Sequence, residues 1–231
     1  GNKSLSAEVA YEEGKVEFKS KNKDWSLISK DLILKEGDSV RVNGDGKVIV
    51  NLDDGSSVRL NSNSAITLSS MDPKHIVISN DNGEIYTRVV KSERVFEVLA
   101  KNITYKSLGT AYKTINTETQ NGVEVYHSQV SIIGVNGQDE ILVEQGKKYF
   151  VVNTNEPDLQ NKVSEVTAEE INKDDFVVWN KSQDEKVSEF KDQMGVLFDL
   201  VPPTLSVTNP KDGDKTQTDK VTVIGTTEAG V

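Results

Sequence analysis

Residues 37–64 constrain the fold more than any other part of the chain. Apolar residues alternate with polar ones in three short runs, and a cluster of Gly, Asn, Asp or Ser residues follows each run. Alternation with a period of two gives a strand one apolar face, and the cluster residues tolerate the positive φ of tight turns. The runs are Val40 and Val42, then Val48, Val50 and Leu52, then Val58 and Leu60; the clusters are residues 43–46, 53–56 and 61–64. The pattern predicts short strands about ten residues apart, which must bury their apolar face against another layer.

The strand pattern continues to residue 152. Further turn signals stand at residues 80–83, 121–122, 136–137 and 145–146, and no helical repeat interrupts them. The spacing predicts a mainly β protein, either β-solenoid-like or a two-sheet sandwich. Residues 1–12 are polar and are expected to fray, so the first strand is expected around Val16 and Phe18. The expected core includes Val50, Leu52, Val58, Leu60, Phe96, Val98 and Leu108.

The chain changes character after residue 155 and is expected to form a helical appendage over residues 155–200. Thr167 and Glu170 have the spacing of a capping box, which predicts a short helix to about Lys173. A second helix is expected from about Asp174 to Gln193. Its apolar side would be formed by Phe176, Trp179, Val187, Phe190 and Met194, and we expect Trp179 and Phe190 to dock on the β domain. The many acidic residues of the appendage are expected to face water.

Charge and composition exclude several classes of function. A net charge of −10 opposes binding to the phosphates of nucleic acids, and the absence of cysteine excludes disulfides, thiol catalysis and Cys-ligated zinc. No run approaches the ~20 apolar residues needed to cross a bilayer, so no membrane insertion is expected for this chain. No signal peptide precedes Gly1, and we expect the chain to be the mature or trimmed exterior of a longer protein.

No constellation of residues indicates catalysis, a cofactor or a metal. The two histidines, His75 and His127, lack a second histidine at ligand spacing, and no nucleophile or nucleotide-binding motif occurs. Asp53 and Asp54 could suggest a calcium loop or paired glycosidase carboxylates, but their spacing fits turn chemistry better. The tyrosines near strands are expected to be half-buried, with their hydroxyl groups in water, although exposed rings could stack on sugars. The sequence therefore predicts no catalytic, cofactor or metal residue, and it leaves weak calcium binding open.

Residues 52–64 resemble the "dGS-x-v-x-L-n-x-x-S" signature of the FecR domain, an extracytoplasmic β-rich module. Later steps match in order, so the resemblance covers about residues 37–152 and implies a FecR-like β domain over residues 1–154. One step departs, because Ser128-Gln129 stands where the family usually has Glu-Gly. The motif residues, for which the resemblance implies an architectural role, are Asp54, Gly55, Ser56, Leu60, Gly83, Glu84, Phe96, Val98, Leu108, Gly109 and Thr110.

Residues 201–231 resemble the opening of a bacterial Ig-like domain. Leu205 and Val207 would form its first strand, Val221 and Val223 the next, and residues 228–230 a turn. An Ig sandwich needs about 100 residues, so the natural protein is expected to continue. We expect this incomplete segment to be mobile, or to borrow partner strands from a neighbouring molecule.

These resemblances lead to three functional hypotheses. The first is a non-enzymatic cell-surface or secreted module that acts in scaffolding, adhesion or interaction. The second is the sensory exterior of a transmembrane regulator, because FecR domains relay signals to an anti-sigma segment across the cytoplasmic membrane. The third is a carbohydrate-binding accessory module of a larger surface enzyme. All three place the chain outside the cytoplasm, and the first two imply a protein or cell-surface partner.

Overall fold

The computed structural model describes residues 3–29, 31–134, 137, 140–159, 162–199 and 205–227. The protein is mainly β, as predicted, and 15 strands belong to one hydrogen-bonded system. These strands are β1 (Ala7–Lys19), β2 (Ser26–Leu27), β3 (Ile33–Leu34), β4 (Ser39–Leu52), β5 (Ser57–Leu60), β6 (Ala65–Asp72), β7 (His75–Arg88), β8 (Val95–Ala100), β9 (Ile103–Ser107), β10 (Ala111–Asn116), β11 (Gln120–His127), β12 (Gln129–Gly134), β13 (Glu140–Glu144), β14 (Lys147–Val152) and β15 (Ser164–Glu165). They are followed by α1 (Ala168–Lys173), α2 (Asp175–Asp184), the 3-10 turn η1 (Gly195–Phe198), and the separate pair β16 (Leu205–Asn209) and β17 (Ile224–Thr227).

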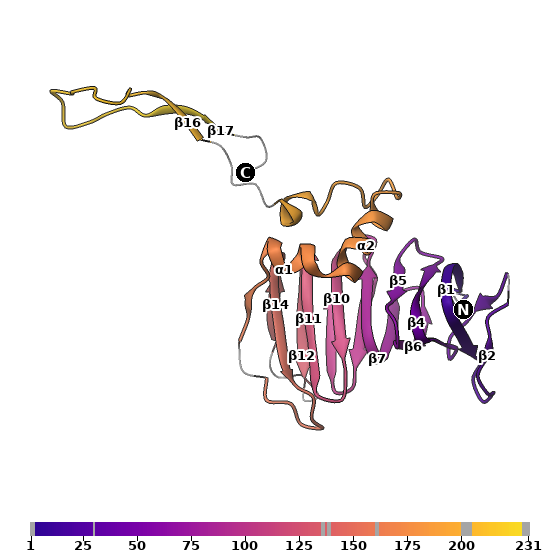
Figure 1. The fold of residues 1–231 in the computed structure, drawn as a ribbon. Helices are drawn as coiled ribbons and strands as arrows, with labels where there is room; N and C mark the ends of the chain where they lie inside the picture. Colours follow the sequence, from indigo (N-terminus) through magenta and orange to yellow (C-terminus); the bar gives the residue numbers. More distant parts are fainter. Residues whose placement is uncertain are drawn as a thin grey trace.

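The strands form two sheets that share bent strands. In the first sheet, the start of β4 pairs with β6, and the start of β7 continues to β8, β9, β12 and β13. In the second sheet, the end of β4 pairs with β5, and the end of β7 continues to β10, β11, β14 and β15. Among the described strands, only β7 and β8 pair in parallel. Of the two expected arrangements, this is the two-sheet one, and Figure 1 shows β1 and β2 at one end of the body and β14 at the other.

The bends explain two wrong turn predictions. Residues 43–46 lie inside β4 and residues 80–83 inside β7, at the points where each strand passes from one sheet to the other. Gly46 lies opposite Gly14 of β1, and a Cβ on Gly46 would lie 2.0 Å from the Glu13 carbonyl oxygen. At Gly83, with φ +86°, a Cβ would lie 2.3 Å from the Ser64 Oγ. Glycine at these positions therefore bends a continuous strand, because a neighbouring strand leaves no room for a side chain.

Three other local predictions need correction. Residues 121–122 lie within β11, and the turn that precedes this strand is at residues 117–119. Residues 7–12 do not fray, because β1 begins at Ala7 and pairs with β4. The predicted turn at residues 136–137 falls mainly outside the described residues. The turns at residues 53–56, 61–64 and 145–146 are confirmed.

The core lies between the sheets and is made of the alternating residues. Six of the seven expected core residues are at most 4% exposed, which confirms Val50, Leu52, Val58, Leu60, Phe96 and Val98. Leu108 is 54% exposed, so that prediction is wrong. The reason is that β9 ends at Ser107, after which the strand no longer directs alternate side chains inward.

The hairpin of β16 and β17 stands apart from the body in Figure 1, and all of its described strand residues are exposed. Leu205 and Val207 lie in a strand, as expected. Val221 and Val223 do not, because the second strand starts at Ile224. The expected turn at residues 228–230 lies outside the described residues. The Ig-like assignment stays a prediction.

Candidate functional site

The outer face of the second sheet is buried, although its residues alternate with core residues and would face water in an isolated sheet. We call this surface the covered face and define it by Ser57, Arg59, Tyr86, Arg88, Ala111, Lys113 and Tyr126, which are at most 3% exposed. They come from β5, β7, β10 and β11, and α1, α2 and the chain after α2 lie over them. Figure 1 shows both helices on one side of the strands. A second apolar cluster, separate from the inter-sheet core, joins Tyr86, Ala111 and Tyr126 to Ile171, Phe176, Val177 and Met194.

An ion network with a single carboxylate lies at the centre of the covered face. Asp184, at the end of α2, is 2.7 Å from Arg59 Nη1 and 3.5 Å from Arg88 Nε. Arg59 also donates to the backbone and side-chain oxygens of Asn180, at 3.2 and 3.3 Å. All three charged side chains are at most 3% exposed, and burial lowers the pKa of the Arg88 guanidinium. The expectation that the acids of the appendage face water is therefore wrong for Asp184.

Tyr86 connects this network to the end of the appendage. Its hydroxyl group is 2.7 Å from Asp184 Oδ2 and 3.0 Å from the Met194 Sδ. Burial, reinforced by the negative charge of Asp184, raises the pKa of the phenol well above its usual range. Tyr86 therefore stays protonated and acts as a hydrogen-bond donor.

Lys113 forms a second ion cluster on the covered face. Its ammonium is paired with Asp174 and lies 3.6 Å from Glu124 and 3.9 Å from Glu84. Burial alone would lower the pKa of Lys113, but the surrounding carboxylates raise it above its usual value. Asp174 is also the N-cap of α2, where it accepts from the Phe176 amide at 3.0 Å. One side chain thus starts the helix and fastens it to the sheet.

The helices of the appendage were predicted in part. The capping box of Thr167 and Glu170 is present, and α1 ends at Lys173 as expected. The second helix ends at Asp184 rather than Gln193, and the chain continues in tight turns. In a continuing helix the Phe190 carbonyl would accept from the amide four residues on. Here it accepts from Arg88 Nη2, at 3.1 Å.

The expected docking of the two aromatic residues is confirmed. Trp179 is half-buried, and its ring centroid lies 5.8 Å from that of Tyr11 on β1. Phe190 is 5% exposed and packs against the guanidinium of Arg88, 4.5 Å from the ring centroid. Val187, expected on the same side, is instead exposed because the helix has ended.

The first group of motif residues lies around the connection between β7 and β8. Asp54 Oδ2 is 2.6 Å from Arg94 Nη1 and accepts from the Ser56 hydroxyl at 2.9 Å. Ser56 Oγ in turn accepts from the Val90 amide at 3.2 Å, and Gly55, with φ +89°, lies against Val90. These contacts hold residues 89–94 from one side.

A second group holds the same connection from the other side. Thr110 is buried, and its backbone exchanges two hydrogen bonds with Val89, at 2.8 and 3.2 Å. Gly109 lies so close to Lys91 that a Cβ would be 2.8 Å from the lysine Cβ. Glu84 lies elsewhere, accepting from Asn61 at 3.1 Å near the bend at Gly83. The polar and glycine motif residues therefore lie at loops and bends and do not form a cleft, whereas Leu60, Phe96 and Val98 lie in the core between the sheets.

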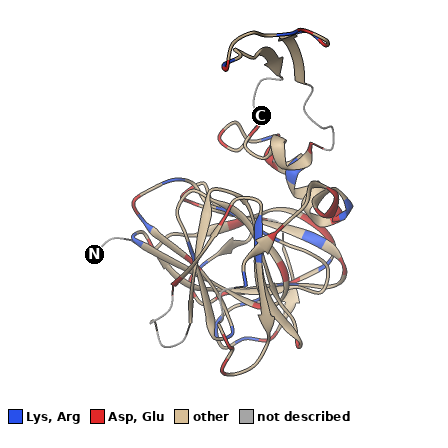
Figure 2. Ribbon diagram, turned by 90° about the vertical axis from the view of Figure 1, so that its left-hand side faces the viewer, with Lys and Arg blue, Asp and Glu red and all other residues tan. Residues whose placement is uncertain are grey.

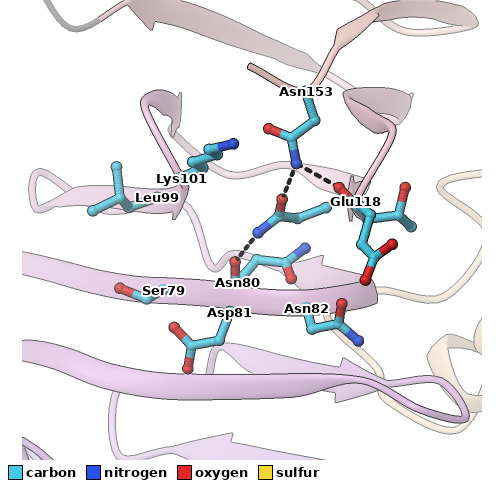
Figure 3. Close-up of a pocket in the computed structure, with 10 residues that line it drawn as sticks. Ser79, Asn80, Asp81, Asn82, Leu99, Lys101, Glu118 and Asn153 are labelled. Atoms are coloured by element: carbon cyan, nitrogen blue, oxygen red, sulfur yellow. Dashed lines mark hydrogen bonds between the residues drawn. The ribbon is translucent and has the colours of Figure 1, made fainter. Parts of the chain in front are cut away.

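A polar cavity of about 420 Å³ opens beside the middle of β7. Asn116 donates to the Asn80 carbonyl oxygen at 2.7 Å, and Asn153 donates to the Asn116 side chain at 2.8 Å. Figure 3 shows these amides linked across the cavity, with Asp81 and Glu118 also at its walls. The amide donors bind protein oxygens and tie strand ends together.

The remaining sequence candidates take local roles. Asp53 accepts from the amide and hydroxyl of Ser6, and His75 lies 2.7 Å from Glu97 at the surface. Burial lowers the pKa of His127, and the positive charge of Arg88 lowers it further. No group of three or more His, Cys, Asp or Glu residues in the described part of the chain could hold a metal ion.

The tyrosines expected to be half-buried are fully buried. Tyr105 and Tyr126 donate to Asn121 and Glu124, at 2.6 and 2.7 Å, instead of reaching water. Tyr86, Tyr105, Tyr112, Tyr126 and Tyr149 are all 0% exposed. These five rings therefore cannot form a platform for stacking sugars.

Comparison with known proteins identifies the central domain. Residues 38–131 match a family model described as FecR protein. These residues form a FecR domain. The match ends inside β12, so β13 and β14 continue the two sheets of the FecR domain beyond the matched range. No curated protein matches the chain.

Two crystal structures also resemble the chain. Both are of a protein described as a "putative anti-sigma factor" from Parabacteroides distasonis ATCC 8503, at 2.50 and 1.65 Å resolution. Each is 19% identical with a TM-score of 0.47, and each alignment covers 55% of this chain. The chain spans only 58% of the length of those proteins.

The sequence missed the covered face because each of its residues looks like an ordinary outward strand position. The available signal was the placement of Arg59, Arg88 and Lys113 at outward positions of strands in a chain rich in acids. Figure 2 shows basic residues lying among acidic ones across the body and beside the helices. The covered face can bind a helical segment through buried ion pairs.

No described helix is long and apolar enough to cross a membrane.

Proposed function

We propose that the FecR domain is the non-catalytic sensory part of an extracytoplasmic signalling regulator and works by contacting protein partners. The observation that carries this proposal is the family match of residues 38–131. Domains of this family lie outside the cytoplasmic membrane and relay a signal to an anti-sigma segment inside. Because proteins of this family are regulatory, we infer a role in signalling for this chain.

The described site supports binding rather than catalysis. The motif residues Asp54 and Ser56 fasten a loop, and the buried ionisable groups of the covered face pair with the appendage rather than line an open cleft. Hydrogen-bonded, buried charges of this kind fix one arrangement of two elements against each other. A partner that changes this arrangement could pass a signal on through the chain.

Deletion in the natural host tests the proposal. We expect in-frame removal of residues 38–131 to change transcription from promoters that depend on the cognate sigma factor, while removal of residues 205–227 leaves it unchanged. RNA sequencing of both strains, with immunoblots showing equal protein amounts, measures this. Unchanged transcription in the first strain refutes the sensory function.

A second candidate function is a scaffolding or adhesive surface module. It is favoured by the hairpin of β16 and β17, whose sequence resembles the opening of an Ig-like domain and whose Leu205 is 71% exposed. A complete domain would bury such residues between two sheets. If deleting residues 38–131 changes adhesion or surface assembly but no transcript, this candidate replaces the first.

A further inference from the structure

The ion network at the centre of the covered face contains two buried cations, Arg59 and Arg88, but only one carboxylate, that of Asp184. Arg59 and Arg88 are 2% and 1% exposed, and both reach for the single carboxylate of Asp184. The shorter contact, 2.7 Å, belongs to Arg59, whereas Arg88 stands at 3.5 Å. Burying a cation without a partner of its own is unfavourable, so the position of Arg88 calls for an explanation.

Neutral groups take the place of a second carboxylate at Arg88. Its Nη2 donates to the Phe190 carbonyl at 3.1 Å and to the Gln193 side-chain oxygen. Its Nε makes no hydrogen bond within the described part of the chain. Arginine carries a planar fork of donors that matches a carboxylate, and bonds between charged groups are about twice as strong as neutral ones. A carboxylate would therefore satisfy Arg88 better than the acceptors it has.

The segment that supplies these neutral acceptors follows α2 and is less regular than the two helices. We call residues 185–198 the cover. It has no α-helix, and its backbone bonds connect mainly residues three apart, as from the Phe190 amide to the Val187 carbonyl at 2.9 Å. Val187 and Val196 are 36% and 59% exposed. The buried apolar side chains of the cover are those of Phe190 and Met194. Surface segments without regular secondary structure open at a lower cost in free energy than core strands do.

Helix α2, which precedes the cover, is held to the sheet at both of its ends by contacts that do not involve the cover. Lys113 binds Asp174 at the start of α2, and Arg59 binds Asp184 at its end. Opening of the cover would leave both contacts intact and would uncover Arg88 beside Tyr86 and His127. The pocket vacated by Phe190 and Met194 would lie next to it, because both side chains are buried there now.

We propose that Arg88 is a carboxylate-recognition site for an acidic segment of a partner protein, and that the cover is displaced when that segment binds. The partner segment would carry Asp or Glu next to an aromatic or aliphatic residue, which would replace Phe190. With the partner bound, the buried network would contain two cations, Arg59 and Arg88, and two carboxylates, that of Asp184 and that of the partner. The inference rests on the proposed function only in taking the partner to be a protein.

Binding of a defined peptide to the full chain tests this inference. The probe is fluorescein-labelled Glu-Glu-Phe-Asp-Glu-Glu, and its control replaces every acid by Gln or Asn. Fluorescence anisotropy gives affinity, and amide hydrogen exchange with mass spectrometry compares residues 185–198 with residues 168–184. We expect the acidic peptide to speed exchange in the cover alone, and the neutral peptide to do nothing.

Three variants locate the binding site. Gln193→Ala removes an acceptor from the cover and leaves Arg88 in place, so it should tighten peptide binding about tenfold, because a larger fraction of molecules is open. Arg88→Met should abolish binding. Arg41→Met is the matched control, because Arg41 pairs with Glu17 on the first strands, 2.8 Å away, and should bind the peptide like the wild type.

Specific results would overturn the inference. Equal affinity of the wild type and Gln193→Ala would show that the cover does not compete with the peptide. Equal binding of the acidic and neutral peptides would remove the role of the carboxylate, and both results hold even if Arg88→Met fails to fold. A regulator that loses signalling when residues 38–131 are deleted but keeps it with Arg88→Met refutes this inference and leaves the proposed function standing.

Discussion

Replacing Asp184 by Asn should destabilise the protein by about 3–5 kcal/mol, the usual result of breaking a buried ion pair from one side. Asn has nearly the same volume as Asp, so the substitution removes charge without opening a cavity. It leaves Arg59 and Arg88 buried with no carboxylate within 4.0 Å in the described part of the chain. The hydroxyl group of Tyr86 keeps an acceptor, so the loss is essentially electrostatic.

Because two buried cations share one carboxylate, substitutions of Asp184 and of Arg88 should lower the free energy of unfolding by different amounts. Arg88→Met removes the cation that only neutral groups and a distant carboxylate satisfy, so its cost should be smaller, about 1–3 kcal/mol. In the Asp184→Asn background the same change removes an unpaired charge and should cost less still. The double-mutant cycle should therefore show a coupling energy of about 1–3 kcal/mol.

Urea denaturation measures both effects. Circular dichroism follows the sheets, and Trp179 emission in a Trp25→Phe background follows the appendage, which contacts Tyr11 through this tryptophan. Coincident transitions would show that the appendage unfolds with the β domain. A loss below about 1 kcal/mol for Asp184→Asn, or strict additivity in the cycle, would refute the electrostatic account of the covered face.

Three further predictions follow from single residues. Leu60→Ala should cost about 2–5 kcal/mol in urea denaturation, and Leu108→Ala, at an exposed leucine, less than about 0.5 kcal/mol. Ser128→Gly should raise stability by about 0.5–1 kcal/mol, because Ser128 has φ +62°, which costs a side chain energy that glycine avoids. The pKa of His127 is lowered in the folded protein, so the unfolded chain binds a proton first as the pH falls. The free energy of unfolding should therefore be highest above the ordinary pKa of about 6.5 and decrease as the pH falls below it. His127→Gln should flatten this decrease in thermal melts from pH 8 to 5.

Each of these predictions has a result that contradicts it. Equal costs for the two leucines would mean that the inter-sheet core is not where the structure places it. A less stable Ser128→Gly variant would show that the serine side chain contributes more than its backbone costs. A pH profile that flattens with His75→Gln but not with His127→Gln would place the titrating group at the surface.

Sequence patterns predicted correctly those strands and helix ends that depend on residues close together in the chain. The alternation of Val48 to Leu60 predicted core strands correctly, and Thr167 with Glu170 predicted a helix start. The clusters at residues 43–46 and 80–83 were mistaken for turns because glycine with positive φ serves a turn and a strand bend equally. Only the opposing strand, with Gly14 against Gly46, decides between them.

The covered face was beyond local reasoning for a different reason. Arg59 occupies an outward strand position, and an isolated sheet would leave it in water. Its burial depends on Asp184, which is distant in sequence and lies on a helix whose polar side also looked solvated. Likewise, α2 ends at Asp184 and the Phe190 carbonyl accepts from Arg88, a residue about a hundred positions earlier in the chain that a local reading of residues 185–193 does not include.

The distribution of charge connects the fold to the proposed signalling role. In a chain of net charge −10, Arg59, Arg88 and Lys113 are placed under an acidic appendage instead of on the surface. Apolar packing alone would hold the appendage without discriminating among partners, whereas buried cations require a carboxylate in a defined position. A competing segment must therefore bring its own acid to Arg88. This requirement would make the covered face selective among partners, and the cover would keep it closed in the absence of one.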